Sequence, residues 1–330
     1  MSKNYLVTGG TGFIGTAIIK KLLKKKGNKV VCFDSNIRGS LKKLGEDIHK
    51  IKIITADIRN LDAVVKASKK IDCIIHLAFL NGTEYFYNKP DLVLDIGVKG
   101  IINIIEACKK NKIKELIVAS SSEVYQRASV IPTPENIPFS IPDVFNPRYS
   151  YATGKILSEV MAINNSKLFK RLIIFRPHNV YGPDMGFEHV VPQLIIRMKK
   201  NIDKKKTGKI RFLIKGTGNE TRAFNYIDDF SEGLMKIINK GKHLNIYNIG
   251  TQEEVSISKV VKLIGKYFKR EIIIIKSPGH PGSTQRRCPN IAKIKLLGYK
   301  PKTKLKDGIK IVADWYLKNY KLNKHQKKIK

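Results

Sequence analysis

The sequence contains few cysteines and no long uncharged hydrophobic run. Its four cysteines lie far apart, with no CxxC pair and no histidine at metal-ligand spacing, so we expect neither a disulfide framework nor a metal site. Isolated thiols of this kind are typical of a protein of the reducing cytoplasm. No segment reaches the roughly 20 apolar residues of a membrane-spanning helix, and the first residues run into a predicted strand rather than a signal peptide. We therefore expect a cytoplasmic protein without membrane contact.

Acidic residues are scarce relative to basic ones. The chain has 27 Asp and Glu against 63 Lys and Arg among 330 residues, a formal net charge of +36. Such an excess favours association with nucleic acid, an anionic membrane or an anionic small molecule. A nucleic-acid-binding protein would gather its basic residues on one face with aromatic residues between them. The lysines here are spread over most predicted helices, so we expect no nucleic-acid partner.

Short β-rich segments alternate with longer amphipathic segments over the first half of the chain. Strands are predicted at residues 5–8, 29–33, 51–55, 73–77, 115–119 and 171–176, and helices at residues 14–26, 61–68, 93–111 and 151–169. Nearly continuous Ile and Val strands separated by helix-length segments predict a parallel sheet with helices on both faces. The predicted fold class is therefore α/β, a Rossmann-type doubly wound parallel sheet with a smaller C-terminal lobe. We expect the sheet domain at 1–177, rejoined by about 224–250, the lobe at 178–223 and 251–320, and a basic tail at 321–330.

A glycine-rich turn follows the first predicted strand. Gly9 allows a tight turn, Gly12 lets the backbone approach a pyrophosphate, and Gly15 lets the next helix pack closely on the strand. The helix that starts at Phe13 and Ile14 would direct its free N–H groups and its positive dipole end at the phosphates. Because the turn follows a strand and opens a helix, it predicts a dinucleotide site.

The second predicted strand ends in a carboxylate. Asp34 lies 19 residues after Gly15, where an acidic side chain binds the adenosine ribose 2′-hydroxyl and repels a 2′-phosphate. The predicted cofactor is therefore NAD rather than NADP. The nearby Arg38 favours NADP instead, because its positive charge would neutralise a 2′-phosphate.

A tyrosine and a lysine lie four residues apart on one predicted helix. Tyr151 and Lys155 therefore share a helical face. The ammonium of Lys155 would favour the phenolate and lower the pKa of Tyr151 from about 10. A phenolate takes a proton from a hydroxyl group while hydride leaves the same carbon for a nicotinamide.

Three serines and a glutamate end the fifth predicted strand. Ser120, Ser121, Ser122 and Glu123 lie at the carboxyl edge of the sheet, where ligands bind in such folds. We expect one serine hydroxyl to hydrogen-bond the reacting oxygen. The alternative is a polar turn without a catalytic role.

Taken together, these residues resemble those of the extended short-chain dehydrogenases/reductases, in the nucleotide-sugar epimerase/dehydratase group. The resemblance covers nearly the whole chain. It implies that Asp57 and Ile58 hold the adenine and that Leu77 and Ala78 line the cofactor channel. It also implies a homodimer formed by the helices at 93–111 and 151–169.

The same resemblance assigns the substrate, a nucleotide-diphosphate sugar. Ser121 and Tyr151 would bracket the 4-hydroxyl of the sugar, with Ser122 beside them. The residues expected to bind the diphosphate are Asn179, Arg222 and Arg287, the last aligning better than its neighbour Arg286. Arginine suits this task because its planar fork makes bidentate contacts.

The family's shared first step is oxidation at C4, which gives a bound 4-keto sugar and NADH. The resemblance makes Glu123 a candidate second acid/base, as in 4,6-dehydratases and nucleotide-glucuronate decarboxylases. A third alternative pairs Glu123 with His189 on either side of the sugar ring, by similarity to the GDP-mannose 3,5-epimerases. The sequence thus predicts an epimerase/dehydratase and leaves epimerisation, dehydration and decarboxylation open. A remote alternative is an NAD-binding protein without catalysis, which would have no need of Ser121, Tyr151 and Lys155.

Overall fold

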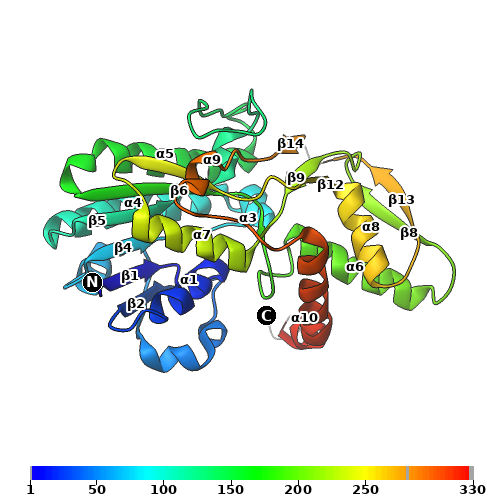
Figure 1. The fold of residues 1–330 in the computed structure, drawn as a ribbon, viewed down its shortest axis with the longest axis horizontal. Coiled ribbons are helices and arrows are strands. Elements are labelled where there is room, and N and C mark those ends of the chain that lie inside the picture. The colour runs from blue at the N-terminus through cyan, green and yellow to red at the C-terminus, as the bar shows by residue number, and fades with distance from the viewer. Residues whose placement is uncertain (1, 280–281, 327–330) are drawn as a thin grey trace.

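A seven-stranded parallel sheet forms the centre of the fold (Figure 1). The computed structural model describes residues 2–279 and 282–326. In spatial order the strands are β11 (Asn245–Ile249), β6 (Arg171–Pro177), β5 (Glu115–Ala119), β4 (Cys73–His76), β1 (Asn4–Thr8), β2 (Lys29–Asp34) and β3 (Lys52–Thr55). Every neighbouring pair is parallel, so the carboxyl ends of all seven strands lie at one edge. The predicted α/β fold class is confirmed.

Adjacent residues of the central strands face opposite layers, because strand side chains alternate. Leu6 and Ile74 belong to the buried cluster shared with α2 (Leu61–Ala67), α4 (Pro90–Lys110) and α5 (Ser150–Asn164). Val7 and Ile75 belong to the cluster shared with α1 (Phe13–Leu23) and α7 (Ile227–Lys240). The sheet is therefore covered on both faces, which explains why its strands read as continuous apolar runs.

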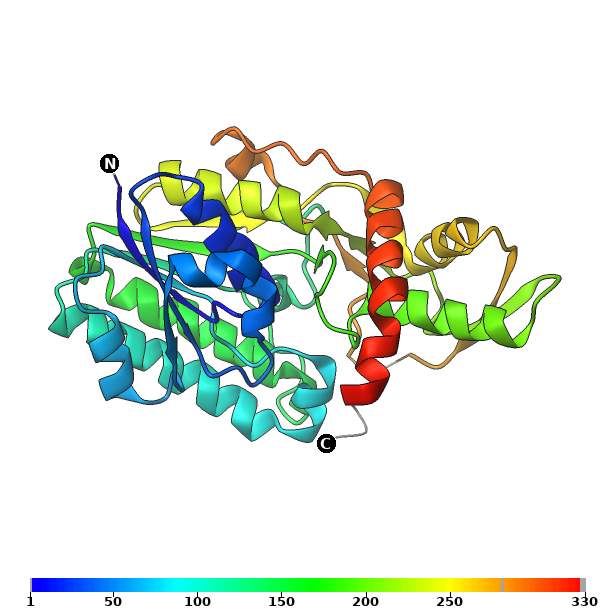
Figure 2. The ribbon, with the colours of Figure 1, turned by 90° about the horizontal axis from the view of Figure 1, so that it is seen from below.

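The second lobe is built from short strands and three longer helices. Its two small sheets contain β8 (Ile210–Lys215) with β13 (Ile272–Ser277), and β9 (Thr221–Ala223) with β12 (Glu254–Ser256) and β14 (Arg286–Arg287). The helices are α6 (Val190–Lys204), α8 (Ile257–Tyr267) and α10 (Leu305–Gln326). Strands β7 (Val180–Tyr181) and β10 (Asn225–Tyr226) pair with each other. Helix α10 lies between the sheet domain and α6 (Figure 2).

The predicted strands and helices of the first half are present, with their ends displaced by a few residues. The helix predicted at 151–169 stops at Asn164, where the backbone of Asn165 leaves the helical conformation with φ −100° and ψ 12°, and a 3₁₀ turn follows at Ser166–Leu168. Two further short helices, α3 (Thr83–Asn88) and α9 (Ala292–Lys295), were not among the predictions.

The C-terminal helix α10 continues through Gln326. Residues 321–326 of the expected basic tail therefore continue a helix, and residues 327–330 lie outside the described residues. Across the described part of the chain, every helix is too short or too polar to cross a membrane.

Candidate active site

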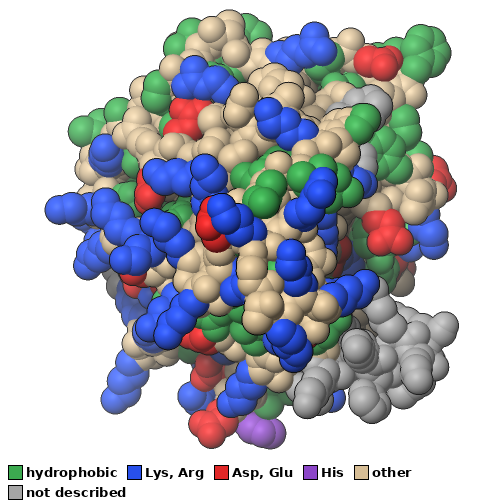
Figure 3. Space-filling model, turned by 90° about the vertical axis from the view of Figure 1, so that its right-hand side faces the viewer, with side chains coloured by type: hydrophobic (Ala, Val, Ile, Leu, Met, Phe, Trp, Pro, Cys, Tyr) green, Lys and Arg blue, Asp and Glu red, His purple; other side chains and the backbone are tan. Residues whose placement is uncertain are grey.

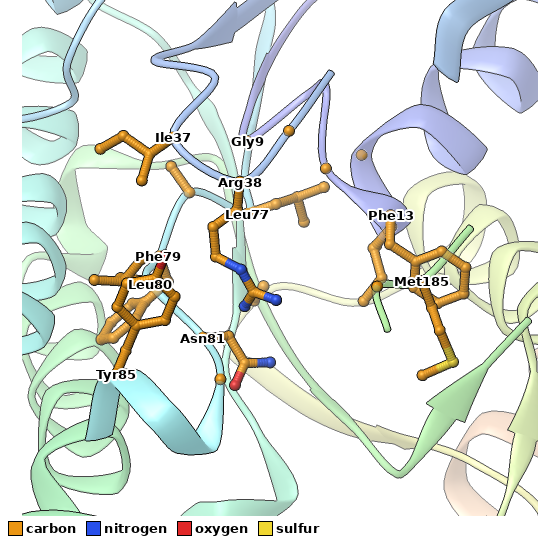
Figure 4. A pocket seen from close by; sticks show the side chains of 18 of the residues that line it. Gly9, Phe13, Ile37, Arg38, Leu77, Phe79, Leu80, Asn81, Tyr85 and Met185 are labelled. Carbon is orange, nitrogen blue, oxygen red and sulfur yellow. The ribbon is translucent and has the colours of Figure 1, made fainter. Parts of the chain in front are cut away.

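A cavity of about 1660 Å³ opens at the carboxyl edge of the sheet. Phe79 and Tyr85 lie on one side of it, Phe13 and Met185 lie on the other, and Arg38 points in between them (Figure 4). The sequence-predicted residues that line it are Gly9, Gly12, Phe13, Ile14, Gly15, Asp34, Asp57, Ile58, Leu77, Ala78, Ser121, Ser122, Glu123, Tyr151, Lys155, Asn179, His189 and Arg287. Arg222 is not part of this lining.

The glycine turn leaves no room for side chains at two of its three positions. A Cβ on Gly15 would lie 2.1 Å from the carbonyl oxygen of Gly9. Gly9 has a φ of +69°, and a Cβ there would lie 2.9 Å from the backbone nitrogen of Ala78. At Gly12 a Cβ would meet only the Gly9 oxygen, at 3.2 Å. Gly12 also caps α1 without a side-chain bond, so the first N–H groups of α1 are open to a phosphate at the cavity.

Asp34 is held in place at the end of β2 by two backbone donors. The N–H of Thr11 donates to Oδ2 at 3.0 Å and the N–H of Asn36 to Oδ1 at 2.8 Å. Arg38 forms an ion pair with Glu188 of the second lobe, and its guanidinium carbon lies 5.7 Å from the ring centre of Tyr85. The carboxylate that favours NAD is thus presented to the cavity, while Arg38 already has an acidic partner.

Asp57, one of the two residues expected at the adenine, takes part in an ion-pair network. Arg59 bonds Asp57 at 2.6 Å and Asp95 at 2.7 Å. The hydrogen bonds from Arg59 hold the pKa of the Asp57 carboxyl below its usual value. Ile58 is buried. The network fixes the turn after β3 at the rim of the cavity.

Tyr151 is buried between two aromatic rings. Its ring centre lies 5.1 Å from that of Phe79 in an edge-on arrangement and 5.0 Å from that of Phe86 in a stacked one. Burial raises the pKa of Tyr151 well above its ordinary value, and a hydrogen bond with Ser121 opposes that rise. Ser121 also accepts from the N–H of Glu123 at 3.1 Å. Ser121 and Tyr151 therefore meet at the carboxyl edge of the sheet.

The Lys155 ammonium lies nearer to Phe79 than to Tyr151. Its Nζ donates to the carbonyl oxygen of Ala119 at 2.6 Å and lies 4.2 Å from the ring centre of Phe79, against 5.8 Å from that of Tyr151. Burial lowers the pKa of Lys155 to about 7, while the charge of Glu159 opposes that fall. Desolvation dominates both groups, so the lowering of the Tyr151 pKa by Lys155 stays a prediction.

Glu123 lies among three arginines. Its Oε1 is 2.6 Å from Nη1 of Arg287, and its Oε2 is 3.9 Å from Nη2 of Arg148. Burial alone would raise the pKa of Glu123, but Arg287, Arg148 and Arg222 outweigh it and hold the pKa at about 2. Glu123 is therefore a carboxylate at neutral pH. Arg148 was missed from the sequence, although it lies only three residues before Tyr151.

The two neighbouring arginines of β14 have different surroundings. Arg286 is exposed and pairs with Glu254 at 2.8 Å. Arg287 is 9% exposed and donates to Oγ1 of Thr284 at 2.9 Å. Arg222 of β9 lies opposite Arg287 in the parallel register, and burial, followed by the charge of Arg287, lowers the pKa of Arg222 to about 10. The structure thus brings Arg287 rather than Arg286 to the cavity.

His189 and Asn179 occupy the second-lobe side of the cavity. His189 precedes α6, and its Nε2 lies 3.8 Å from Oε1 of Glu188. Burial lowers the pKa of His189, so its pairing with Glu123 across a sugar ring stays a prediction. Asn179 adopts a φ of +39°, and its buried Nδ2 has no hydrogen-bond partner within the described residues. This amide is thus free to donate to a ligand.

The four cysteines do not line the cavity. All four cysteines are buried and free. Nowhere in 2–279 and 282–326 do three His, Cys, Asp or Glu side chains gather to hold a metal ion.

Comparison with known proteins gives one consistent family. The model of the NAD dependent epimerase/dehydratase family matches residues 5–250. The chain is 32% identical over 326 residues to a putative UDP-glucose 4-epimerase of Methanocaldococcus jannaschii, covering 95% of this chain and 98% of that protein. It is 29% identical over 332 residues to the UDP-N-acetyl-alpha-D-glucosaminuronate decarboxylase of Bacillus cytotoxicus, covering 96% and 98%.

The solved structures agree on the fold. The UDP-glucose 4-epimerase of Thermotoga maritima, solved with UDP-glucose, superposes with a TM-score of 0.84 at 23% identity, covering 96% of this chain and 99% of that one. At this identity the likeness supports the doubly wound fold with its second lobe.

Proposed function

Because the chain belongs to the NAD-dependent epimerase/dehydratase family, we propose that it oxidises a nucleotide-diphosphate sugar at C4 to a bound 4-keto intermediate. The family makes it an NAD-dependent enzyme. One observation carries the assignment to sugar oxidation: Ser121, Tyr151 and Lys155 line the same cavity as the glycine turn and Asp34. A hydroxyl-bearing carbon held there lies within reach of both a base and a dinucleotide.

The residues present fit the dinucleotide. The turn at Gly9 and Gly15 excludes side chains, the N-terminus of α1 faces the cavity, and Asp34 is oriented by two backbone donors. Bound NAD supplies a hydride acceptor at the nicotinamide. The residues proposed to hold it are Gly9, Gly12, Phe13, Ile14, Gly15, Asp34, Asp57, Ile58, Leu77, Ala78 and Lys155.

In the proposed reaction Tyr151 takes the proton of the 4-hydroxyl and Ser121 donates a hydrogen bond to the same oxygen. Since burial raises the pKa of Tyr151, the phenolate needs support from positive charge. Lys155, one turn along α5, is the nearest cationic group on that helix. The low-dielectric site strengthens the interaction.

The second lobe is proposed to bind the rest of the substrate. Residues 178–223 and 251–320 would form this lobe, with the sheet domain at 1–177 and about 224–250. Asn179, Arg222 and Arg287 are assigned to the diphosphate, and Ser122 and His189 to the sugar or nucleotide. The free amide of Asn179 and the deep position of Arg287 support this placement.

The test is incubation with UDP-, GDP-, CDP- and dTDP-sugars, followed by mass spectrometry and NMR of the products. A new epimer of unchanged mass or a product that has lost water supports the proposal, with the Tyr151→Phe variant as the inactive control. No change in any sugar, together with no reduction of NAD, would refute it.

A second candidate function is decarboxylation of a nucleotide-uronate, favoured by the arginines around Glu123. Arg148, Arg222 and Arg287 outnumber the single carboxylate of Glu123, so this part of the site carries a net positive charge that favours an anionic sugar. The test supplies UDP-glucuronate and its N-acetylated relatives. Release of carbon dioxide supports this candidate, and full recovery of the uronate excludes it.

We further propose a cytoplasmic homodimer. Apolar side chains on the outer faces of α4 and α5 remain more than a third exposed: Ile102 39%, Leu157 38%, Val160 41% and Ile163 37%. These two helices pack against each other. A second copy of the chain would cover these exposed side chains.

A further inference from the structure

A fully buried ion pair lies behind the active site. Glu159 of α5 and Arg176 of β6 are 0% and 1% exposed. Arg176 donates from Nε to Oε1 at 2.8 Å and from Nη2 to Oε2 at 2.7 Å. Neither residue lines the cavity. Burying two charges is costly unless every hydrogen bond is made, so the pair needs a reason beyond packing.

The Glu159 end of the pair contacts α5 and the serine turn, which we define as Ser120, Ser121 and Ser122. Glu159 lies one turn after Lys155 on α5, on the same face. Ser120, which precedes Ser121, donates its hydroxyl to Oε1 of Glu159. Lys155 donates to the carbonyl of Ala119, the residue before Ser120. The carboxylate of Glu159 thus lies beneath the segment that presents Ser121.

The other end of the pair reaches the 3₁₀ helix that carries Glu123, Ser122–Tyr125. Arg176 donates from Nη1 to the Tyr125 hydroxyl at 2.7 Å, and Tyr125 donates to Oδ1 of Asn248 at 2.8 Å. Asn248 lies in β11. One buried network therefore ties α5, the end of β5 and the edge strand of the sheet to both sides of the serine turn.

Glu159 is the charge that supports Lys155. Three titratable side chains face the Lys155 ammonium within the described chain: His76 of β4, Tyr151 and Glu159 of α5. Burial, followed by the charge of Lys155, lowers the pKa of His76 to about 3, so this histidine is neutral. Tyr151 is neutral too, because burial raises its pKa. Only Glu159 offers Lys155 an opposite charge.

We propose that Glu159, fixed by Arg176, is a positioning residue that keeps Lys155 cationic and anchors the turn bearing Ser121. The proposal rests on the proposed function only where turnover is measured. Glu159 touches neither substrate nor cofactor. It acts through Lys155 by charge and through Ser120 by a hydrogen bond.

The first test follows the ionisation of Lys155 directly. A ¹⁵N-lysine NMR titration, assigned with Lys155→Met, is run on the wild type, Glu159→Gln and Ser120→Ala. In Glu159→Gln we expect the pKa of Lys155 to fall by about 1 to 3 pH units, the size of effect that a nearby opposite charge exerts. Ser120→Ala, which keeps both charges, should leave it unchanged. Equal titration in all three proteins would overturn the proposal.

Glu159→Gln leaves Arg176 buried without its ionic partner, which would destabilise the fold. A second variant keeps the test valid if that single variant does not fold. Glu159→Gln with Arg176→Gln removes both charges and their desolvation cost. The double variant should show the same fall in the Lys155 pKa. The separate variant Glu159→Asp keeps the negative charge and should keep the wild-type pKa of Lys155. A double variant with wild-type Lys155 titration would assign the pair to packing alone.

The pH–rate profile supplies the catalytic readout. Because loss of the Lys155 charge with rising pH removes support for the Tyr151 phenolate, the alkaline limb of kcat should shift to lower pH in Glu159→Gln by the same interval as the NMR pKa. If the wild type turns over no nucleotide sugar, the proposed function fails while the NMR test still decides the role of Glu159. A shifted NMR pKa with an unshifted profile would refute the catalytic part.

Discussion

At the scale of single residues, the site combines groups whose charged forms are disfavoured by their surroundings. Tyr151 and Lys155 are both buried, which raises the pKa of the phenol and lowers that of the ammonium. Tyr151 is therefore neutral at neutral pH, whereas Lys155, with a pKa of about 7, is divided between its charged and neutral forms. A base must be ionised before it takes a proton, so in the proposed reaction the charge of Lys155 supports the Tyr151 phenolate before proton transfer begins.

Tyr151→Phe tests the base without disturbing the packing. The phenylalanine ring keeps the contacts with Phe79 and Phe86 and loses only the hydroxyl. We expect turnover to fall by about 100-fold or more, the contribution typical of a positioned acid–base group. The midpoint of thermal unfolding should change little. Near-normal turnover measured by NMR of the products would assign the proton to another group.

Arg287 and Arg286 form a matched pair for testing the anion site. We expect Arg287→Gln to raise KM for the nucleotide sugar about 10- to 100-fold, because a hydrogen bond to a charged group contributes about 1.5–3 kcal/mol. Arg286→Gln removes the same charge from the same strand, but from an exposed ion pair with Glu254. It should change KM less than about twofold, given the small worth of surface pairs. Equal effects would remove Arg287 from the substrate site.

The ion pair between Arg287 and Glu123 predicts how the stability of the fold depends on pH. The folded-state pKa of Glu123 is held at about 2, below the ordinary value of about 4.3. The pair therefore stabilises the fold above about pH 4.3 and loses that effect as pH falls toward 2. The stability gap between wild type and Arg287→Gln, measured by urea unfolding, should be largest at neutral pH and shrink below pH 4. A gap that widens in acid would contradict the assignment.

The residues of the recognised motifs were predictable from sequence, whereas their charged partners were not. The glycine motif and the tyrosine–lysine pair are recognised by their local spacing along a turn or a helix. Arg148 and Glu159 are ordinary charged residues whose partners depend on the tertiary fold; Glu123 and Arg287 lie 164 positions apart. Local spacing also does not reveal burial, which raises the pKa of Tyr151.

At the scale of elements, the turn between β1 and α1 separates a packing requirement from a binding requirement. A Cβ at Gly15 would overlap the Gly9 carbonyl, at 2.1 Å, while one at Gly12 meets a single atom at 3.2 Å. Gly15 is therefore needed for the helix to approach the strand. We expect Gly12 to be needed instead for a ligand to approach the helix.

Alanine substitutions should separate these two roles. Gly15→Ala should destabilise the protein by about 1–3 kcal/mol, the usual cost of overpacking, and lose NAD binding with it. Gly12→Ala should keep nearly the wild-type unfolding midpoint and still bind NAD at least about tenfold more weakly. Calorimetry of unfolding and of NAD binding checks both. Wild-type NAD affinity in Gly12→Ala would exclude the turn as the pyrophosphate site.

Element prediction succeeded where periodicity is long and failed where it is short. Helices α4 and α5 and six strands of the central sheet carry enough apolar residues to be recognised, whereas β11 was expected only as part of a segment returning to the sheet domain. Strands β7, β9, β10 and β14 have two or three residues each, too few for an alternating pattern. Their pairing comes from tertiary contact, such as the register that places Arg287 opposite Arg222.

At the scale of the whole molecule, the apolar surface of α4 and α5 predicts the oligomeric state. Leu157→Glu combined with Val160→Glu places two charges in the proposed interface, where their desolvation is costly. We expect this variant to be a monomer by size-exclusion chromatography with light scattering, while the wild type is a dimer. Ile311→Glu on α10, equally exposed at 45%, is the control and should remain dimeric. A monomeric wild type would refute the proposal.

The net charge of +36 predicts how substrate capture depends on salt. Lysine and arginine side chains are scattered over the molecular face in Figure 3, with few acidic ones between them. A positive field of this kind accelerates the encounter with anionic ligands, and salt screens it over about 30 Å at 0.01 M but only about 8 Å at 0.15 M.

Two lysines of equal charge decide whether this field acts locally or over the whole surface. Lys42 is exposed and lines the cavity, whereas Lys262 is exposed on α8 of the second lobe. Because a charge near the opening dominates the local potential, Lys42→Glu should lower kcat/KM at low salt several-fold more than Lys262→Glu, with kcat unchanged in both. The difference should vanish at high salt. Equal losses in the two variants would show that only the net charge matters, and salt-independent kcat/KM in the wild type would show that the basic surface takes no part in substrate capture.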